Sequence, residues 1–252
     1  SLLINGTKES PVTVEGNSSG GIFIKNNKEQ VSIIKNTTFS NLATLNSLLS
    51  RYTGSVNGYG GIFILEDVNI SNGEAEDQLN LINAKINITG LNIDNAVSDA
   101  FDCDFCEGTI KYLNLKDVGG DGLDISGSKL KVSQMEAKYI KDKAFSVGEK
   151  SYAEIDNAEY DTIATGIAVK DSSIVEASNI SLKNVGYDSF MTYVKKPFYM
   201  GETRLEVKKY STNDDSTNIC VREKGTNLII NNENCDISEI DVDTLYQGRM
   251  KK

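Results

Sequence analysis

The stretch Asp121-Gly122-Leu123-Asp124-Ile125 decides the fold, because its pattern returns at a fixed spacing. The pattern is a small residue, then a large apolar residue and, in most copies, another apolar residue two positions later. The other copies lie at 99–103, 143–147, 165–169 and 188–192, so successive copies are 22, 22, 22 and 23 residues apart. A constant period of this kind marks a stacked-repeat architecture. The short alternating runs within each period indicate strands rather than helices.

Two further columns keep this period, one mostly apolar and one mostly polar. The apolar column consists of Ala96, Val118, Ile140, Thr162 and Val185, and the polar column of Asn72, Asn95, Asp117, Tyr139, Asp161 and Asn184. Asparagine at a bend can bond its own backbone and the neighbouring coil, which is typical of a turn ladder. Together the columns predict an all-β chain, a right-handed parallel β-helix with roughly 22 residues per coil and coils about 4.8 Å apart.

The large apolar residue of each copy is expected to point into the helix. This interior column consists of Phe101, Leu123, Phe145, Ile167 and Phe190. Burying each of these side chains contributes roughly 1.5–3 kcal/mol. No coil can bury its apolar face alone, so stability is expected to come from stacking on neighbouring coils.

The repeat leaves no room for a domain boundary in the 252 residues, so we expect a single domain over residues 1–252. Roughly eleven coils would fill that length. Strand-like sequence begins at once, which favours a fragment of a longer chain with a missing upstream domain. Residues 42–49 are expected to form a short helix or an excursion, and the basic end 249–252 is expected to be solvated.

Composition excludes several classes of function. The chain contains no histidine, which excludes a histidine base, a Ser-His-Asp triad and the usual zinc sites. The net charge of −10 repels phosphate backbones, so nucleic acid is not an expected partner. No run of 18 apolar residues occurs, so the chain is not expected to span a membrane.

Four cysteines are too few to predict a disulfide scaffold. Cys103 aligns with Ile125 and Val147, which predicts a core thiol. The Cys103-x-x-Cys106 spacing could also form a redox pair, but no helix follows it. Whether Cys220 pairs with Cys235 stays open.

Several of these stretches resemble a known superfamily. They are 99–105, 121–128, 143–151, 166–171 and 195–197. Together they resemble the right-handed parallel β-helix superfamily of pectate lyases, alginate epimerases and related bacterial surface proteins, some of which are attached to a spore-coat-kinase-like domain. The likeness covers roughly residues 60–210. It implies the fold and a secreted or cell-surface bacterial protein, and it carries over no catalytic residue, because no lyase motif can be placed.

Acidic residues form the sharpest candidate site. Asp99 and Asp121 share one column, and Asp102 and Asp124 share another. Carboxylates stacked one coil apart repel each other, so Ca²⁺ bound by these four residues is one expectation, and Lys143 in the first column is another source of compensating charge. A lyase or epimerase would combine such a metal with Lys143 as the base and with Asp121 and Asp124 as catalytic residues. The alternative is a solvated, salt-bridged turn column.

Aromatic and basic residues around an interruption of the repeat form a second candidate site. The predicted substrate-binding residues are Tyr187, Tyr193, Lys195, Lys196 and Tyr199. Exposed rings can stack on sugars, and insertions often carry function. The alternative is that these side chains cover the interrupted coil.

Three hypotheses follow for function. The first is a secreted or cell-surface module that binds or presents itself to polysaccharide. The second is a calcium-assisted uronate lyase or epimerase, and the third is a structural spacer. Whether the chain is an enzyme stays open at this point.

Overall fold

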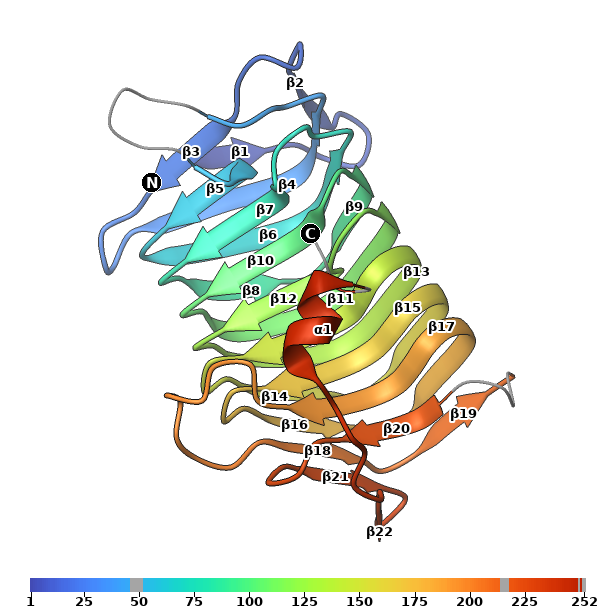
Figure 1. Cartoon of the computed structure of the whole chain (residues 1–252). Coiled ribbons are helices and arrows are strands. Elements are labelled where there is room, and N and C mark those ends of the chain that lie inside the picture. Colours follow the sequence, from blue (N-terminus) through green and yellow to red (C-terminus); the bar gives the residue numbers. More distant parts are fainter. Residues whose placement is uncertain (46–51, 214–217, 249, 251–252) are drawn as a thin grey trace.

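The computed structural model describes residues 1–45, 52–213, 218–248 and 250. It confirms a single parallel β-solenoid (Figure 1). The solenoid has about nine turns of about 23 residues each. No helix in the described part of the chain is long and apolar enough to cross a membrane.

The turns stack their strands into three faces. The first, here called the groove face, contains β3 (Ile22–Lys25), β5 (Gly54–Tyr59), β7 (Asp77–Ile82), β10 (Asp99–Asp104), β12 (Leu123–Ser126), the last parts of β13 (Lys129–Gly148), β15 (Ala158–Lys170) and β17 (Ile180–Tyr193), and β20 (Asn218–Arg222).

The other two faces are formed in part by long strands that continue from one face to the next. The second contains β1 (Leu3–Asn5), the first parts of β4 (Val31–Ser40), β6 (Ile62–Ser71), β11 (Glu107–Val118) and β13, together with β8 (Lys85–Ile88), β14 (Tyr152–Ile155), β16 (Ile174–Ala177), β18 (Arg204–Val207) and β21 (Asn227–Ile230). The third contains β2 (Val12–Glu15), β9 (Leu91–Ala96), β19 (Tyr210–Thr212) and the remaining parts of the long strands.

The predicted interior column is confirmed. Backbone pairing places Phe101 beside Leu123, Leu123 beside Phe145, Phe145 beside Ile167, and Ile167 beside Phe190. All five side chains are fully buried. They belong to one continuous core, as expected for a solenoid whose coils bury their apolar faces on one another.

The two corner columns need a correction of one residue. Ile140 pairs with Ile163, so Ile163 rather than Thr162 continues the apolar column. Thr162 takes the left-handed bend position, with φ 56°, that the sequence assigns to Asp161. The reason is that Lys129 pairs with Tyr152, 23 residues on, which adds one residue to this coil. The spacing returns to 22 where Lys143 pairs with Thr165.

The expected eleven coils are wrong, because two connections take up extra residues. On the groove face Ile22 pairs with Val56, 34 residues later, and Phe190 pairs with Cys220, 30 residues later. Of the segment 42–49, for which a helix or an excursion was expected, residues 46–49 lie outside the described part of the chain, and residues 42–45 are not helical.

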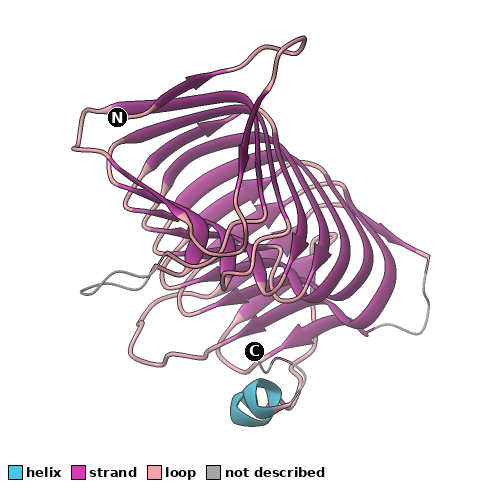
Figure 2. Ribbon diagram, turned by 90° about the horizontal axis from the view of Figure 1, so that it is seen from above, coloured by secondary structure: helices cyan, strands magenta, loops and turns pink. Residues whose placement is uncertain are grey.

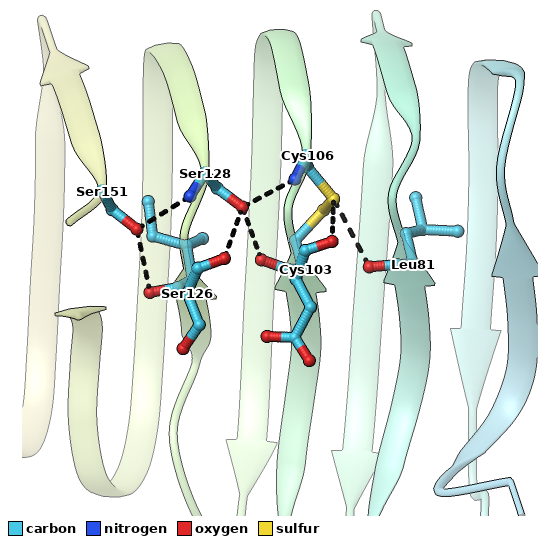
Figure 3. The surroundings of a disulfide bond; sticks show 8 residues. Leu81, Cys103, Cys106, Ser126, Ser128 and Ser151 are labelled. Atoms are coloured by element: carbon cyan, nitrogen blue, oxygen red, sulfur yellow. Dashed lines mark hydrogen bonds between the residues drawn. A yellow bond between two sulfur atoms is a disulfide. The ribbon is translucent and has the colours of Figure 1, made fainter. Parts of the chain in front are cut away.

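All four cysteines are paired in disulfides, Cys103 with Cys106 and Cys220 with Cys235. Cys103 lies in the core as predicted, but it is not a free thiol. Cys106 lies at the start of a column that Ser128 and Ser151 continue in the next coils, as Figure 3 shows. Ser128 Oγ accepts the N–H of Cys106 at 2.8 Å, and Ser151 Oγ accepts the N–H of Ser128 at 3.0 Å. Two disulfides indicate an oxidising environment.

The C-terminal segment does not continue the solenoid. Helix α1 (Val242–Gln247) lies outside the stack of strands, as Figure 2 shows. A second apolar cluster connects this segment to the solenoid. Ala168, Met191 and Tyr193 on the outside of the groove face pack in it with Met250 and partly buried residues of the segment such as Leu245. Met250 is 3 % exposed, so the prediction of a solvated C-terminal end is wrong at this residue.

Candidate functional site

One column on the outside of the groove face changes its chemistry along the solenoid. Backbone pairing aligns Asn57, Asn80, Asp102, Asp124, Ser146, Ala168 and Met191. This column, here called the outer column, therefore runs from amides through carboxylates to apolar side chains. Its apolar end is the part that packs in the cluster with the C-terminal segment. The polar end of the outer column lies outside this cluster and can form a site.

The acidic columns predicted from the sequence are in register. Asp102 pairs with Asp124. Asp99 Oδ1 accepts the backbone N–H of Asp121 at 2.8 Å, and Asp121 Oδ1 accepts that of Lys143 at 3.0 Å. One carboxylate oxygen each from Asp99, Asp121 and Asp124 lies within 4.8 Å of the others. Asp102 is not in that group of three.

Lys143 supplies a buried positive charge beside this cluster. Its Nζ lies 2.9 Å from Asp121 Oδ1 and 2.5 Å from Asp142 Oδ2, and its side chain is 2 % exposed. Burial lowers the pKa of Lys143, but Asp121 and Asp142 more than offset this, so the pKa is raised. Lys143 is therefore a fixed cation at neutral pH. The base role predicted for it requires the neutral amine, which this environment disfavours.

Two further lysines reach the same region. Lys170 Nζ donates to Ser146 Oγ at 2.6 Å and lies 3.7 Å from Asp124 Oδ1. Lys195 Nζ lies 3.8 Å from the centroid of the Tyr246 ring. Burial and the neighbouring lysines lower the pKa of Lys195. Of the lysines considered, Lys195 is thus the one whose surroundings lower its pKa.

The structure divides the predicted substrate-binding residues into separate groups. Tyr193 is fully buried and its hydroxyl lies 2.7 Å from that of Tyr246, close to Lys195. Tyr199 donates its hydroxyl to Glu149 Oε2 at 2.9 Å, and Lys196 forms an ion pair with the same carboxylate group. Tyr187 is exposed. The predicted substrate-binding residues therefore do not form a single row of exposed aromatic rings.

A groove nearer the N-terminal end of the same face offers such rings. Its volume is about 590 Å³, and its lining includes the rings of Phe23, Tyr52 and Tyr59. The lining also includes Asn57, Asn80 and Asp102 of the outer column, and Asp104, which lies two residues after Asp102. Phe23 and Tyr52 stack with ring centroids 4.4 Å apart. The repeat pattern gives no signal for these rings, because Phe23 and Tyr52 lie on either side of the connection that breaks it.

Asp102 and Asp104 have perturbed acidities in this groove. Burial, followed by the charges of Asp77, Asp104, Asp124 and Asp99, raises the pKa of Asp102 to about 9. Burial and nearby carboxylates also raise the pKa of Asp104, to about 6. At neutral pH Asp102 therefore carries a proton and can both donate and accept hydrogen bonds, whereas Asp104 is mostly ionised.

Comparison of the chain with protein-family models, with curated proteins and with solved structures gives no match. The fold is therefore established by the structure itself, and the resemblance to bacterial pectate-lyase-like proteins stays a prediction.

Proposed function

We propose that the chain is a glycan-binding module of a secreted or cell-surface bacterial protein, and that the groove lined by Phe23, Tyr52 and Tyr59 holds the glycan. The observation that carries this proposal is the meeting of ring faces with a row of amide and carboxyl groups on one solenoid face. Aromatic rings cover the apolar face of a sugar, and carboxyl groups bond its hydroxyl groups.

The groove is favoured over the residues predicted from the sequence because its rings lie together, whereas theirs are separated and their polar groups have partners within the chain. The amides of Asn57 and Asn80 also have partners within the chain, so the carboxyl groups of Asp102 and Asp104 are the polar groups that the groove offers to a ligand. The hydroxyls of Tyr193 and Tyr199 and the ammonium group of Lys196 are all engaged. Tyr59, in contrast, is 42 % exposed at the groove. The two disulfides agree with an extracellular location.

Substitution of one groove ring tests this function. Phe23→Ala is expected to weaken binding on a glycan array or in a polysaccharide pull-down by about tenfold, since a stacked ring contributes roughly 0.5–1.5 kcal/mol beyond its buried area. Phe198→Ala is the matched control, because Phe198 is 73 % exposed on the loop after β17 and does not line the groove. Equal loss in both variants would contradict the groove, and no binding by the intact chain would favour the spacer hypothesis.

A calcium-assisted uronate lyase or epimerase is the second candidate. It is favoured by the three carboxylates that approach within 4.8 Å, because Ca²⁺ prefers such oxygen ligands and would neutralise a uronate carboxylate. Asp99, Asp121 and Asp124 are the residues that would hold the ion. The donor set fits in type, although the Lys143 ammonium already balances Asp121.

Thermal melts test the calcium site. Millimolar Ca²⁺ is expected to raise the Tm by several degrees, because an ion that binds only the folded state stabilises it. Asp124→Asn should abolish the shift, and Mg²⁺ should not reproduce it, since it demands a smaller octahedral site. An unchanged Tm would remove the metal-dependent candidate, and an ultraviolet assay for unsaturated uronates then tests the lyase directly.

A further inference from the structure

A second cavity lies along the corner where the third face turns into the groove face. Its volume is about 640 Å³. The buried side of its lining follows the apolar corner column, which backbone pairing aligns from coil to coil as Ala96, Val118, Ile140 and Ile163. Asn184 and Gly186 add a fifth coil. This cavity, here called the corner cavity, therefore extends along the solenoid axis for four steps of about 4.8 Å each.

Two bend residues of the corner cavity adopt a conformation that their side chains disfavour. In each of its coils the residue before the apolar column has a left-handed φ. Asparagine and aspartate tolerate this conformation best, and they fill three of these positions, at Asn95, Asp117 and Asn184. Tyr139, with φ 59°, and Thr162, with φ 56°, fill the other two. Strain of this kind is typical of functional sites, and the bend itself gives no reason for a ring at position 139.

The charged groups around Tyr139 are mostly paired within the chain. Lys116 Nζ lies 3.2 Å from Asp117 Oδ2, and Lys138 Nζ lies 3.3 Å from Asp161 Oδ2. Lys138 Nζ also lies 5.0 Å from the centroid of the Tyr139 ring, and a cation covers only one face of a ring. Tyr139 remains 42 % exposed. The cavity therefore offers a ring face in surroundings of little net charge.

Side chains rather than backbone groups are available to a ligand at this corner. The backbone groups pair between coils, as where the Gly119 N–H donates to the Ala96 carbonyl at 2.9 Å, so the described corner presents no open strand edge to a peptide. The amides of Asn95 and Asn184 each donate one hydrogen bond to the preceding coil, and their Oδ1 atoms accept none from the described residues. Lys141 is the charged lining residue that forms no ion pair with another described residue. A sugar suits this combination, because its apolar face stacks on a ring and its hydroxyls both donate and accept.

We propose that the corner cavity is a second binding site, for a neutral linear glycan that lies along the solenoid axis and stacks one sugar on Tyr139. The ligand is linear because the same corner position recurs in five coils. It is neutral because most charges at the corner are paired, and the net charge of −10 outweighs Lys141 in its effect on a polyanion. This site goes beyond the proposed function, which places a glycan on the groove face, and it does not depend on that groove.

Titration of the isotope-labelled whole chain, followed by its backbone amide NMR signals, tests the proposal. The probes are hexasaccharides of glucose, of N-acetylglucosamine and of galacturonate, together with a proline decapeptide. The signals of Asn95, Gly119 and Asn184 are expected to shift with at least one neutral hexasaccharide and with neither of the other two probes. This measurement locates the ligand on the intact chain without any variant.

Tyr139→Asn is expected to weaken this binding about tenfold, because it removes the stacking ring. Its Tm should stay at or above that of the parent, since asparagine suits the left-handed bend. Phe105→Asn is the matched control, because Phe105 also has a left-handed φ of 54°, is 60 % exposed and lines neither cavity. It should leave the shifts at the corner unchanged. An unchanged affinity of Tyr139→Asn, or a Tm well below that of the parent, would overturn the role of this ring.

The shift pattern separates the two glycan sites. Shifts confined to the groove face would overturn the second site and leave the proposed function intact. Shifts confined to the corner would support the second site and contradict the proposed groove. Corner shifts caused by the galacturonate oligomer alone or by the peptide alone would overturn the proposed ligand class. Absence of shifts with all three oligosaccharides would contradict both sites.

Discussion

Asp102 connects the two parts of the candidate site. It lines the groove together with Asn80, its neighbour in the outer column, and it pairs with Asp124 on the side of the acidic cluster. Such a crowded group is costly to ionise, because burial and like charges both disfavour the charged form. A change at this residue therefore reports on the electrostatics of the whole face.

The raised pKa of Asp102 predicts how stability depends on pH. Its value is 3.8 in the unfolded chain and about 9 in the folded chain, so between these limits the folded state binds more protons. Stability should therefore fall as pH rises from about 4 to 9. Asp104, raised to about 6, adds to the fall in the lower half of that range.

Asp102→Asn removes the larger contribution. At about pH 8 its Tm is expected to exceed that of the parent by a few degrees, and the two should converge near pH 4. Thermal melts across this range measure the difference. Asp94→Asn is the control of equal charge, because Asp94 is exposed on β9 of the third face. Melting curves of Asp102→Asn that run parallel to those of the parent at every pH would contradict the assignment.

At the scale of one element, β10 differs from its neighbours in carrying a disulfide. Cys103 pairs with Leu81 and Ile125 in the core, so an apolar side chain is the ordinary occupant of its position. The position of Cys106 is taken in the next coils by Ser128 and Ser151, whose hydroxyls accept backbone N–H groups. The disulfide thus joins an apolar core column, at Cys103, to the column of turn hydroxyls, at Cys106.

This arrangement predicts that stability depends on which of the two cysteines is replaced by valine and which by serine. Cys103→Val with Cys106→Ser places in each column a residue type that the column already contains, at Val147 and Ser128, and should lose only the disulfide contribution. Cys103→Ser with Cys106→Val contains the same two residue types but buries a hydroxyl in the core and removes one from the turn. It should be less stable by a further 1–3 kcal/mol or so. Denaturant unfolding measures both free energies, and equal values would show that the columns do not impose these residues.

At the scale of the whole molecule, the C-terminal segment covers one end of the groove face. Tyr246 lies close enough to influence the pKa of Lys143 and of Lys170, both of which are buried. Leu245 and Met250 pack in the cluster that contains Met191 and Tyr193. The solenoid core is a separate cluster, so the segment is an addition to the fold rather than part of its stack.

Deletion of residues 237–252 should therefore leave the solenoid folded while exposing Met191. Circular dichroism is expected to keep its β-sheet signal, with the Tm lower by a few degrees per lost kcal/mol of apolar contact. Methionine oxidation by hydrogen peroxide, read by mass spectrometry, should newly modify Met191, which is buried in the cluster with the segment. Met200, which is 82 % exposed, provides the internal control. Unchanged protection of Met191 would contradict a covering role.

The sequence by itself determined the parallel solenoid, the interior column from Phe101 to Phe190, and the pairing of Asp102 with Asp124. All of these depend on one spacing that recurs along the chain, and a side chain repeated at that spacing must lie above its predecessor. The same reasoning failed by one residue at Asp161 and Thr162, where one coil has an extra residue.

Only the tertiary structure decided the groove rings, the enclosure of Lys143 and the covering helix. Phe23 stacks on Tyr52 across the first irregular connection, and Tyr193 meets Tyr246 from 53 residues away. Asp142 joins Lys143 although no column predicts it. The physical reason is that the path of an irregular connection is set by packing against the finished solenoid, and such packing leaves no period in the sequence.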